Sequence, residues 1–323
     1  MKVAIIGDSA PPLDEGMKKT TASLAEALAN LCSVKIFNPF QVLTIDFWSS
    51  LRNFQPQVIH YVPGPSLKSF ILLTFIKRWI SAKTVASVTH PDPDLPVWIV
   101  ERFFKPDLLL LQSSRSQKQF LPLSCKKEFL PNGVDIQRYK PVLPAEKIIL
   151  RQKYGIPTKS YVVLHVGNTR QIRNLECLIG LQKDNCQVVV VGSSSIQDDS
   201  GVADHLRSAH CIVIDNFIET IEEIFALADC YIFPTTNQVG AIEHPLSVLE
   251  SMACNLPVVA RRFGALPDFF QDGEGIYFAE SDEDIVNIVR KLRKFGWDSQ
   301  NRERMREFDW STIANRLLAL YQL

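Results

Sequence analysis

The segment YVVLHVG, residues 161–167, is a short run that is apolar except for His165 and ends on a glycine. Runs of the same kind follow it, with helical segments between them, at 186–192, 211–216, 230–234 and 256–260. Strands that are apolar on both faces and alternate with helices are typical of a parallel sheet in an α/β domain. The second half of the chain is therefore predicted to be one Rossmann-like domain.

The first half of the chain repeats this alternation. Its apolar runs occupy 3–7, 33–37, 56–62, 84–90 and 107–113. Helices are predicted over 20–31 and near 67–80, and the Pro- and Gly-rich segment 129–147 is predicted to be a linker. We therefore expect an α/β protein whose two Rossmann-like domains face each other across a cleft. The domains are predicted over 1–140 and 141–310, with a C-terminal helix over 311–323 packing back on the first.

The composition excludes several classes of protein. Of 323 residues, 46% are hydrophobic and 22% are charged, which is ordinary for a globular protein. Lys plus Arg and Asp plus Glu both total 35, which argues against a protein held to nucleic acid by bulk charge. The seven cysteines are scattered and form no C-x-x-C pair, so neither a zinc site nor a disulfide framework is expected. The first apolar run turns polar after Gly7, too early for a signal peptide, and we expect a cytoplasmic protein.

The segment SLKSFILLTFIKRWISAK, residues 66–83, combines aromatic and aliphatic residues with four cations. Its longest apolar run, 70–76, is too short to span a bilayer. One interpretation is a half-buried helix that covers the first sheet. The other is an amphipathic helix lying on an anionic bilayer, which would give a peripheral contact with the inner face of the membrane.

The loops after the strands indicate the kind of ligand. The first strand–helix turn has neither G-x-G-x-x-G nor G-x-x-x-x-G-K-[ST], so NAD-dependent and Walker-type chemistry lose their strongest signatures. Arg170 and Arg173 follow the strand at 161–167 and suit an anionic ligand, because arginine engages phosphate through two parallel donors. Solvated loop charges are the alternative. Gly16 is either a loop glycine or a point where the backbone approaches a ligand at a helix start.

The segment QVGAIEHPLSVLESMACNLPVVA, residues 238–260, predicts a helix that begins near Pro245 and is followed by a strand. The amides of Leu246, Ser247 and Val248 are predicted to be unpaired at the helix start and able to bind a phosphate. Glu250 lies about one turn further along, beside the apolar face. A ribose diol is one candidate partner for this carboxylate, and a salt bridge to an arginine is the alternative.

These segments resemble the family-4 retaining glycosyltransferases with the GT-B fold. PPLDEG (11–16) is similar to the Pro-x-x-Gly-Gly loop of the family, and SVTHPDPD (87–94) to the strand end that carries its histidine. LPNGVDIQRYKP (130–141) is similar to the family linker, and ADCYIFPTT (228–236) to its a-D-v-x-v-x-P-S segment. HVGNTRQIRNL (165–175) is similar to V-G-R-l-x-x-x-K-G, and the segment from Glu243 to Glu250 to the Glu-x7-Glu region.

The resemblance implies transfer of a sugar from a nucleotide-diphosphate sugar to a hydroxyl of a carbohydrate or lipid-linked acceptor, with the anomeric configuration kept. The nucleotide would bind mainly the second domain, where Glu250 matches the ribose-binding Glu and Arg173 matches the Lys that stabilises the departing diphosphate. His90 matches the family histidine near the transferred sugar, and Gly16 would let the first domain approach the phosphates. The family is generally metal-independent, so no cofactor is expected.

This sequence departs from the family pattern at two positions. The motif Arg falls on Asn168, and Arg170 is proposed to supply the missing cation. Glu243 stands seven residues before Glu250 instead of eight, so the strict position is Ile242, and whether Glu243 fills the role of the first Glu stays open. The pair Asp92 and Asp94 lies in a loop with two prolines and is interpreted as a turn, not as a metal site.

Two alternatives to a transferase remain. The shifted Glu and the Asn168 replacement would also suit a GT-B protein that binds nucleotide sugars but has lost its chemistry. An epimerase or phosphorylase could act on the same fold. The sequence does not determine the base and sugar of the donor, the acceptor, the linkage or the oligomeric state.

Overall fold

The computed structural model describes residues 1–182, 185–195, 201–297 and 300–323, and this chain divides into two compact units. The first unit comprises Met1–Gly133, Ile242–His244 and Trp310–Leu323. The second comprises Val134–Ala241 and Pro245–Asp309. The sequence-based division is drawn at residue 140 and leaves Ile242–His244 in the second domain.

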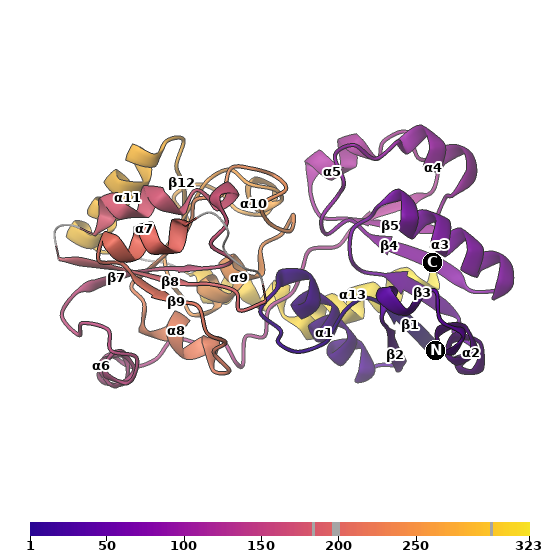
Figure 1. Ribbon diagram of the computed structural model, residues 1–323, viewed down its shortest axis with the longest axis horizontal. Coiled ribbons are helices and arrows are strands. Elements are labelled where there is room, and N and C mark those ends of the chain that lie inside the picture. Colours follow the sequence, from indigo (N-terminus) through magenta and orange to yellow (C-terminus); the bar gives the residue numbers. More distant parts are fainter. Residues whose placement is uncertain (183–184, 196–200, 298–299) are drawn as a thin grey trace. The chain divides into compact units, whose positions relative to one another are not determined.

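The first unit is built on a parallel six-stranded sheet of order β2-β1-β3-β4-β5-β6 (Figure 1). Its strands are β1 Lys2–Ile6, β2 Ser33–Phe37, β3 Val58–Tyr61, β4 Lys83–Ser87, β5 Leu108–Leu111 and β6 Lys126–Phe129. Its helices are α1 Gly16–Ala29, η1 Pro39–Gln41, α2 Ile45–Phe54, α3 Leu67–Trp79, α4 Val97–Phe103, α5 Ser114–Gln119 and α13 Trp310–Gln322. Apolar clusters cover both faces of the sheet, which is why its central strands carry no polar alternation.

The C-terminal helix α13 belongs to this first unit. It packs against α1 and buries Ile313, Leu317 and Tyr321. In Figure 1 it is the yellow helix beside α1. Gly133 makes the approach to α13 possible, since a Cβ there would lie 2.5 Å from Cδ2 of Trp310. The glycine of the PNGVD segment therefore has a packing role.

The second unit has a parallel sheet of the same size, in the order β12-β11-β10-β7-β8-β9. Its strands are β7 Tyr161–Val166, β8 Cys186–Val191, β9 Ile212–Ile214, β10 Cys230–Phe233, β11 Val258–Ala260 and β12 Ile276–Phe278. Its helices are α6 Pro144–Lys153, η2 Gln171–Arg173, η3 Leu175–Leu181, α7 Val202–Ser208, α8 Ile221–Leu227, α9 Leu246–Ala253, α10 Leu266–Phe269, α11 Asp282–Phe295, α12 Asn301–Arg304 and η4 Met305–Phe308. The predicted α/β class with two Rossmann-like sheets is confirmed.

Each sheet contains one strand that the sequence did not reveal. The strand β6, KKEF, is an edge strand of exposed and half-buried residues, so it lacks an apolar run. The strand β12, IYF, has only three residues and also lies at an edge. Short or polar edge strands fall below the length and hydrophobicity on which a sequence pattern depends.

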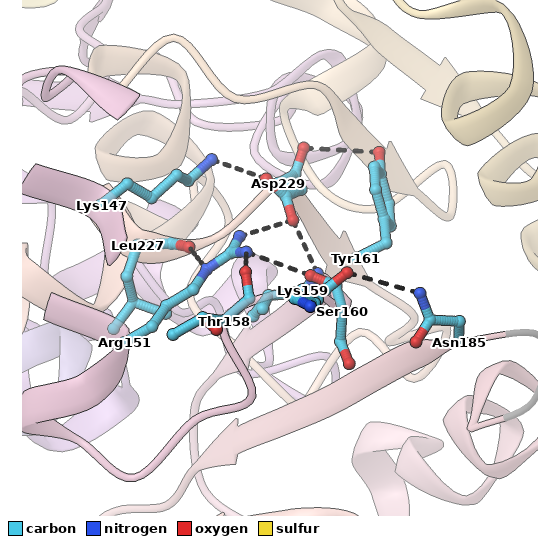
Figure 2. Close-up of polar contacts among 10 residues, drawn as sticks. Lys147, Arg151, Thr158, Lys159, Ser160, Tyr161, Asn185, Leu227 and Asp229 are labelled. Carbon is cyan, nitrogen blue, oxygen red and sulfur yellow. Dashed lines mark hydrogen bonds and ion pairs between the residues drawn. The ribbon is translucent and has the colours of Figure 1, made fainter. Parts of the chain in front are cut away.

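Ion pairs lie at the end of the second sheet where the central strands β7 and β10 begin (Figure 2). The carboxylate of Asp229, just before β10, accepts hydrogen bonds from Arg151 Nη2 at 2.6 Å, Lys147 Nζ at 2.7 Å and the Val162 amide at 2.8 Å. Arg151 Nε also donates to the carbonyl of Leu227. The aspartate of the ADCYIFPTT segment therefore fixes α6 to the sheet.

The helix α3 covers the first sheet with one side only. It buries Phe70, Leu73 and Ile76, whereas Phe75 and Trp79 are exposed. The packing of α3 thus agrees with the interpretation of residues 66–83 as a half-buried helix that covers the first sheet. Within the part of the chain that the structure describes, no helix combines the length and hydrophobicity needed to span a bilayer.

Candidate functional site

The predicted anion-binding residues lie at the point of the second sheet where the order of its strands reverses. From β7 the chain proceeds outward to β8 and β9, then returns to β10 on the other side of β7 and continues to β11 and β12. Ligands of open α/β sheets bind outside the carboxyl ends of the two strands that flank such a switch point, here β7 and β10. Arg170 and Arg173 follow β7 directly, on η2 and its first flanking residue. We call Arg170, Arg173, Leu246–Val248 and Glu250 the second-unit cluster.

The guanidinium of Arg173 is held in an unusual environment. It is half-buried, its Nε has no hydrogen-bond partner, and no carboxylate of the described residues forms an ion pair with it. Burial lowers the pKa of Arg173 to about 10, and the charge of Arg170 acts in the same direction. A cation that has lost water without gaining a counter-ion is stabilised when an anion arrives.

Gly167 allows the turn after β7 to close on these side chains. A Cβ at this position would lie 3.1 Å from Nε2 of His165 and 3.3 Å from Nη1 of Arg173. His165 is buried and its Nδ1 lies 2.9 Å from the carbonyl of Ile232, which identifies Nδ1 as the protonated nitrogen. Burial lowers the pKa of His165 to about 3, so the ring is neutral at pH 7 and its Nε2 is unprotonated.

Tyr231 connects Arg173 to the start of α9. Its hydroxyl donates to Ser247 Oγ at 2.7 Å and approaches the carbonyl of Val166 at 3.3 Å. Burial raises the pKa of Tyr231, while the nearby charge of Arg173 opposes that rise and the charge of Glu250 adds to it. Two of the three charged members of the second-unit cluster, Arg173 and Glu250, therefore lie around one buried phenol.

The helix α9 begins at Leu246, with Pro245 as its N-cap. The structure corrects the expectation for Val248, because its amide donates to the carbonyl of Pro245 at 3.3 Å. The 3₁₀-type turn at the helix start accounts for this difference. Among the described residues, the amides of Leu246 and Ser247 have no such partner and stay available to an anion.

Glu250 is 5% exposed and lies one turn inside α9. Arg138 is the nearby arginine that the alternative interpretation of Glu250 requires. Burial opposes the rise in the pKa of Arg138, Tyr139 and Glu222 raise it most, and the charge of Glu250 adds the smallest part. The direct hydrogen bonds of the Arg138 guanidinium go elsewhere, from Nε to Glu222 at 2.8 Å and from Nη2 to the carbonyl of Glu219.

Sequence reasoning missed three polar residues at this edge. His165 Nε2, Thr235 Oγ1 and Gln238 Oε1 are buried atoms that have no hydrogen-bond partner among the residues that the structure describes, as is Asn168 Oδ1. The loop that carries Thr235 and Gln238 packs on η2, since a Cβ at Gly240 would lie 2.8 Å from Thr235 Cγ2 and 3.4 Å from the carbonyl of Ile172. Buried polar atoms are normally paired, so a group of unpaired ones marks a place that a polar ligand completes. The sequence signal for His165 and Thr235 is a polar residue within or directly after an apolar run, and Gln238 has no such signal.

The remaining predicted residues, Gly16, His90 and Glu243, gather in the first unit, and we call them the first-unit cluster. The amide of Glu243 donates to the carbonyl of Thr89 at 2.7 Å, and the amide of His90 donates to the carbonyl of Gly64 at 2.9 Å. Gly16 lies at the start of α1, where a Cβ would approach Ile242 Cδ1 to 3.2 Å. The segment 242–244 is thus what brings His90, Gly16 and Glu243 together.

Three residues that the sequence did not single out hold this segment in place. Ser113, the N-cap of α5, donates its hydroxyl to the carboxylate of Glu243, and Arg115 Nη1 lies 3.8 Å from Glu243 Oε1. Asn132 of the PNGVD segment donates from Nδ2 to the carbonyl of His244 at 2.8 Å and from its amide to His244 Nδ1 at 3.2 Å. Glu243 is 1% exposed, so these contacts fix its carboxylate firmly.

The pair Asp92 and Asp94 forms a turn. Asp92 Oδ1 accepts a hydrogen bond from the Asp94 amide at 3.0 Å. Across the described ranges of the chain, no group of three or more His, Cys, Asp or Glu residues is arranged to hold a metal ion.

Comparison with known proteins identifies the family. The model described as "Glycosyl transferases group 1" matches residues 146–309, a segment that includes the whole second-unit cluster. The chain belongs to the glycosyl transferases group 1 family. Its curated relatives include sulfoquinovosyl transferase SQD2 of Arabidopsis thaliana. That protein is 24% identical, over 83% of this chain and 57% of its own length. Another is alpha-galactosylglucosyldiacylglycerol synthase of Streptococcus pneumoniae, 23% identical over 68% of this chain and 58% of that protein.

This chain therefore spans less than two thirds of the length of these relatives. Among solved structures, HepE of Anabaena in complex with UDP and glucose has a TM-score of 0.76 at 17% identity, and the match covers 100% of this chain and 99% of that one. Sucrose-phosphate synthase of Thermosynechococcus elongatus has a TM-score of 0.80 at 16% identity and covers 100% of this chain and 98% of that one. The fold of the group 1 chain is therefore GT-B.

Proposed function

We propose that this chain is a family-4 retaining glycosyltransferase that moves a sugar from a nucleotide-diphosphate sugar to an acceptor hydroxyl without a metal ion. The observation that carries the proposal is the second-unit cluster. It combines a desolvated arginine, which has no counter-ion among the described residues, with free amides at a helix start and a buried carboxylate. A nucleoside diphosphate complements all three, through its phosphates and its ribose hydroxyls.

Each residue has a definite role in this proposal. In the transfer, the bond between the anomeric carbon and the diphosphate oxygen breaks while the acceptor oxygen bonds to that carbon, and the proton of the acceptor hydroxyl passes to the departing diphosphate. Arg173, Arg170 and the amides of Leu246 and Ser247 would stabilise the negative charge that develops on the diphosphate. Glu250 would accept hydrogen bonds from the ribose. His90 and Glu243 would bind the transferred sugar. Gly16, which has no side chain, would let the backbone of the first unit approach the phosphates.

The similar proteins support the donor class. HepE of Anabaena is solved in complex with UDP-glucose, and a relative in Mycolicibacterium smegmatis, 31% identical over 188 residues, is a GDP-mannose-dependent mannosyltransferase. The acceptor in our proposal is a carbohydrate or a lipid-linked hydroxyl, in keeping with the glycerolipid named for the Streptococcus relative. We place the reaction in the cytoplasm, with peripheral contact to a membrane where the acceptor is lipid-linked.

A thermal-shift panel of UDP, GDP, ADP and their sugars tests the proposal. A ligand that binds only the folded protein raises its stability according to its affinity, so the tightest binder identifies the donor. Glu250→Gln keeps the size of the side chain and is expected to lose at least tenfold in affinity for the nucleoside diphosphate, about 1.4 kcal/mol for one hydrogen-bonding carboxylate. Asp204→Asn, at an exposed ion pair of α7, is the matched control and should bind normally.

The outcomes separate the candidate functions. Donor binding together with sugar transfer supports the proposal. Nucleotide binding without transfer or donor hydrolysis across an acceptor panel would support the binding-protein alternative, which the Asn168 replacement favours. No stabilisation by any nucleotide would refute the role of the second-unit cluster.

A further inference from the structure

The first unit contains a large pocket that the donor-binding proposal does not use. Its volume is about 880 Å³, within the range of roughly 300–1,000 Å³ typical of small-molecule sites. It is lined by residues after β1, β2 and β3 and by α1, α2 and α3. The chain goes from β1 to its neighbour β2 and then crosses back to β3 on the other side of β1, so the pocket lies at the switch point of this sheet.

One part of the pocket wall is strongly apolar. Phe40, Val42 and Trp48 line it from η1 and α2, and Leu72 and Phe75 line it from α3. The rings of Trp48 and Phe75 meet edge to face at 6.4 Å between centroids. Phe40 is 81% exposed and Phe75 is 66% exposed, so large apolar side chains at this wall are left in contact with water. Such surface on a soluble domain indicates a binding site for an apolar group.

Another part of the wall is polar and adjoins the first-unit cluster. Asp8, Glu15 and Thr21 line it, and Glu15 is the N-cap of α1 directly before Gly16. Lys18 forms ion pairs with Glu15 at 3.3 Å and with Asp8 at 3.8 Å, which holds both carboxylates at the wall. Carboxylate oxygens accept hydrogen bonds from hydroxyl groups. The pocket is thus amphipathic, with the ion-paired Asp8, Glu15 and Lys18 beside Gly16 and aromatic surface along α2 and α3.

We propose that this pocket binds the hydrocarbon chain of an amphiphilic acceptor whose hydroxylated head group lies against Asp8 and Glu15. The proposal rests on the proposed transferase function and assigns that function an acceptor class. A free sugar would leave the aromatic wall unused. A flat bilayer surface would not need a cavity of this volume beside the polar residues. A single chain attached to a polyol head matches both parts of the wall.

Binding of alkyl β-D-glucosides with six, eight and ten carbons, below their micelle concentrations and without any donor, tests the proposal directly. Fluorescence of Trp48 and titration calorimetry report binding, and Trp48→Phe shows which part of the fluorescence change comes from the pocket. Each methylene that enters the pocket should raise the affinity by up to about fourfold. Affinity that does not depend on chain length would overturn the proposal.

The chain offers a closely matched pair of variants. Phe40 lines the pocket, whereas Leu43 is 95% exposed and does not line it. Phe40→Glu places a carboxylate beside the bound chain and should lower decyl glucoside affinity by roughly tenfold or more, whereas Leu43→Glu should leave it unchanged. Leu72→Glu should abolish binding, and its melting curve checks that the variant folds. Equal losses for Phe40→Glu and Leu43→Glu would show adsorption to the surface and refute a pocket.

Failure of this inference is distinguishable from failure of the proposed function. If decyl glucoside binds but no nucleotide does, the pocket stands and the transferase assignment fails. If a free sugar is glycosylated with the same KM as its decyl glycoside, the transferase stands and the acceptor class assigned here is wrong.

Discussion

Arg173 offers the sharpest test of how the second-unit cluster works, because its two expected effects have opposite signs. Burial lowers the pKa of Arg173 from the ordinary value of an arginine to about 10, so the folded protein holds a cation that its surroundings disfavour. A fall of this size corresponds to roughly 3 kcal/mol. Because the side chain is only half-buried, water offsets part of this cost, and we expect a net destabilisation of about 1–2 kcal/mol at neutral pH.

Arg173→Met keeps most of the side-chain volume and removes the charge. The ligand-free variant should therefore melt about 2–8 °C higher than the original protein, using about 2–4 °C per kcal/mol for a unit of this size. The stabilisation by UDP or GDP should largely disappear, and sugar transfer should fall by about 10²–10³-fold, the loss typical of removing one group that stabilises transition-state charge.

Differential scanning fluorimetry with and without nucleotide, together with sugar-nucleotide turnover, measures both effects. Arg170→Met is the companion variant. Arg170 is exposed and only repels Arg173, so its loss should weaken nucleotide binding and raise the stability of the ligand-free protein much less than Arg173→Met does. A less stable Arg173→Met protein that still binds nucleotide and transfers sugar would refute the reasoning.

Two further predictions concern stability. Asp229→Asn leaves the buried guanidinium of Arg151 without its carboxylate (Figure 2), so the free energy of unfolding in denaturant should fall by about 3–5 kcal/mol, whereas Asp204→Asn should change it by less than about 0.5 kcal/mol. Burial lowers the pKa values of His60, His165 and His244 to about 3. Each folded-state pKa lies below the unfolded value near 6.5, so the free energy of unfolding is highest above pH 6.5 and declines as the pH falls toward 3. At pH 5 the decline should be about 2 kcal/mol per histidine. Unfolding titrations at pH 7 and pH 5 measure this decline, which should be smaller in His60→Gln, and an unchanged free energy of unfolding between those pH values would contradict it.

The sequence determined the class of fold and the residues worth examining. Runs such as VAII in β1 and VVLHV in β7 are apolar on both faces, and only a parallel sheet covered on both sides requires that pattern. The helix from Leu246 to Ala253 and the arginines after β7 were visible because caps, prolines and loop charges are local signals. The family followed from the same segments.

Tertiary structure decided which of these residues meet. Nothing local in the sequence shows that Ser113 and Asn132 hold Glu243 and His244 in the first unit, because these contacts join residues more than 100 positions apart. The partnerless state of Arg173, Thr235 and Gln238 and the amphipathic pocket at the first sheet's switch point depend likewise on what surrounds each side chain after folding. Patterns along the chain encode secondary structure and burial, whereas desolvation, hydrogen-bond pairing and cavity shape are properties of neighbours in space, and the chemistry of this protein rests on those.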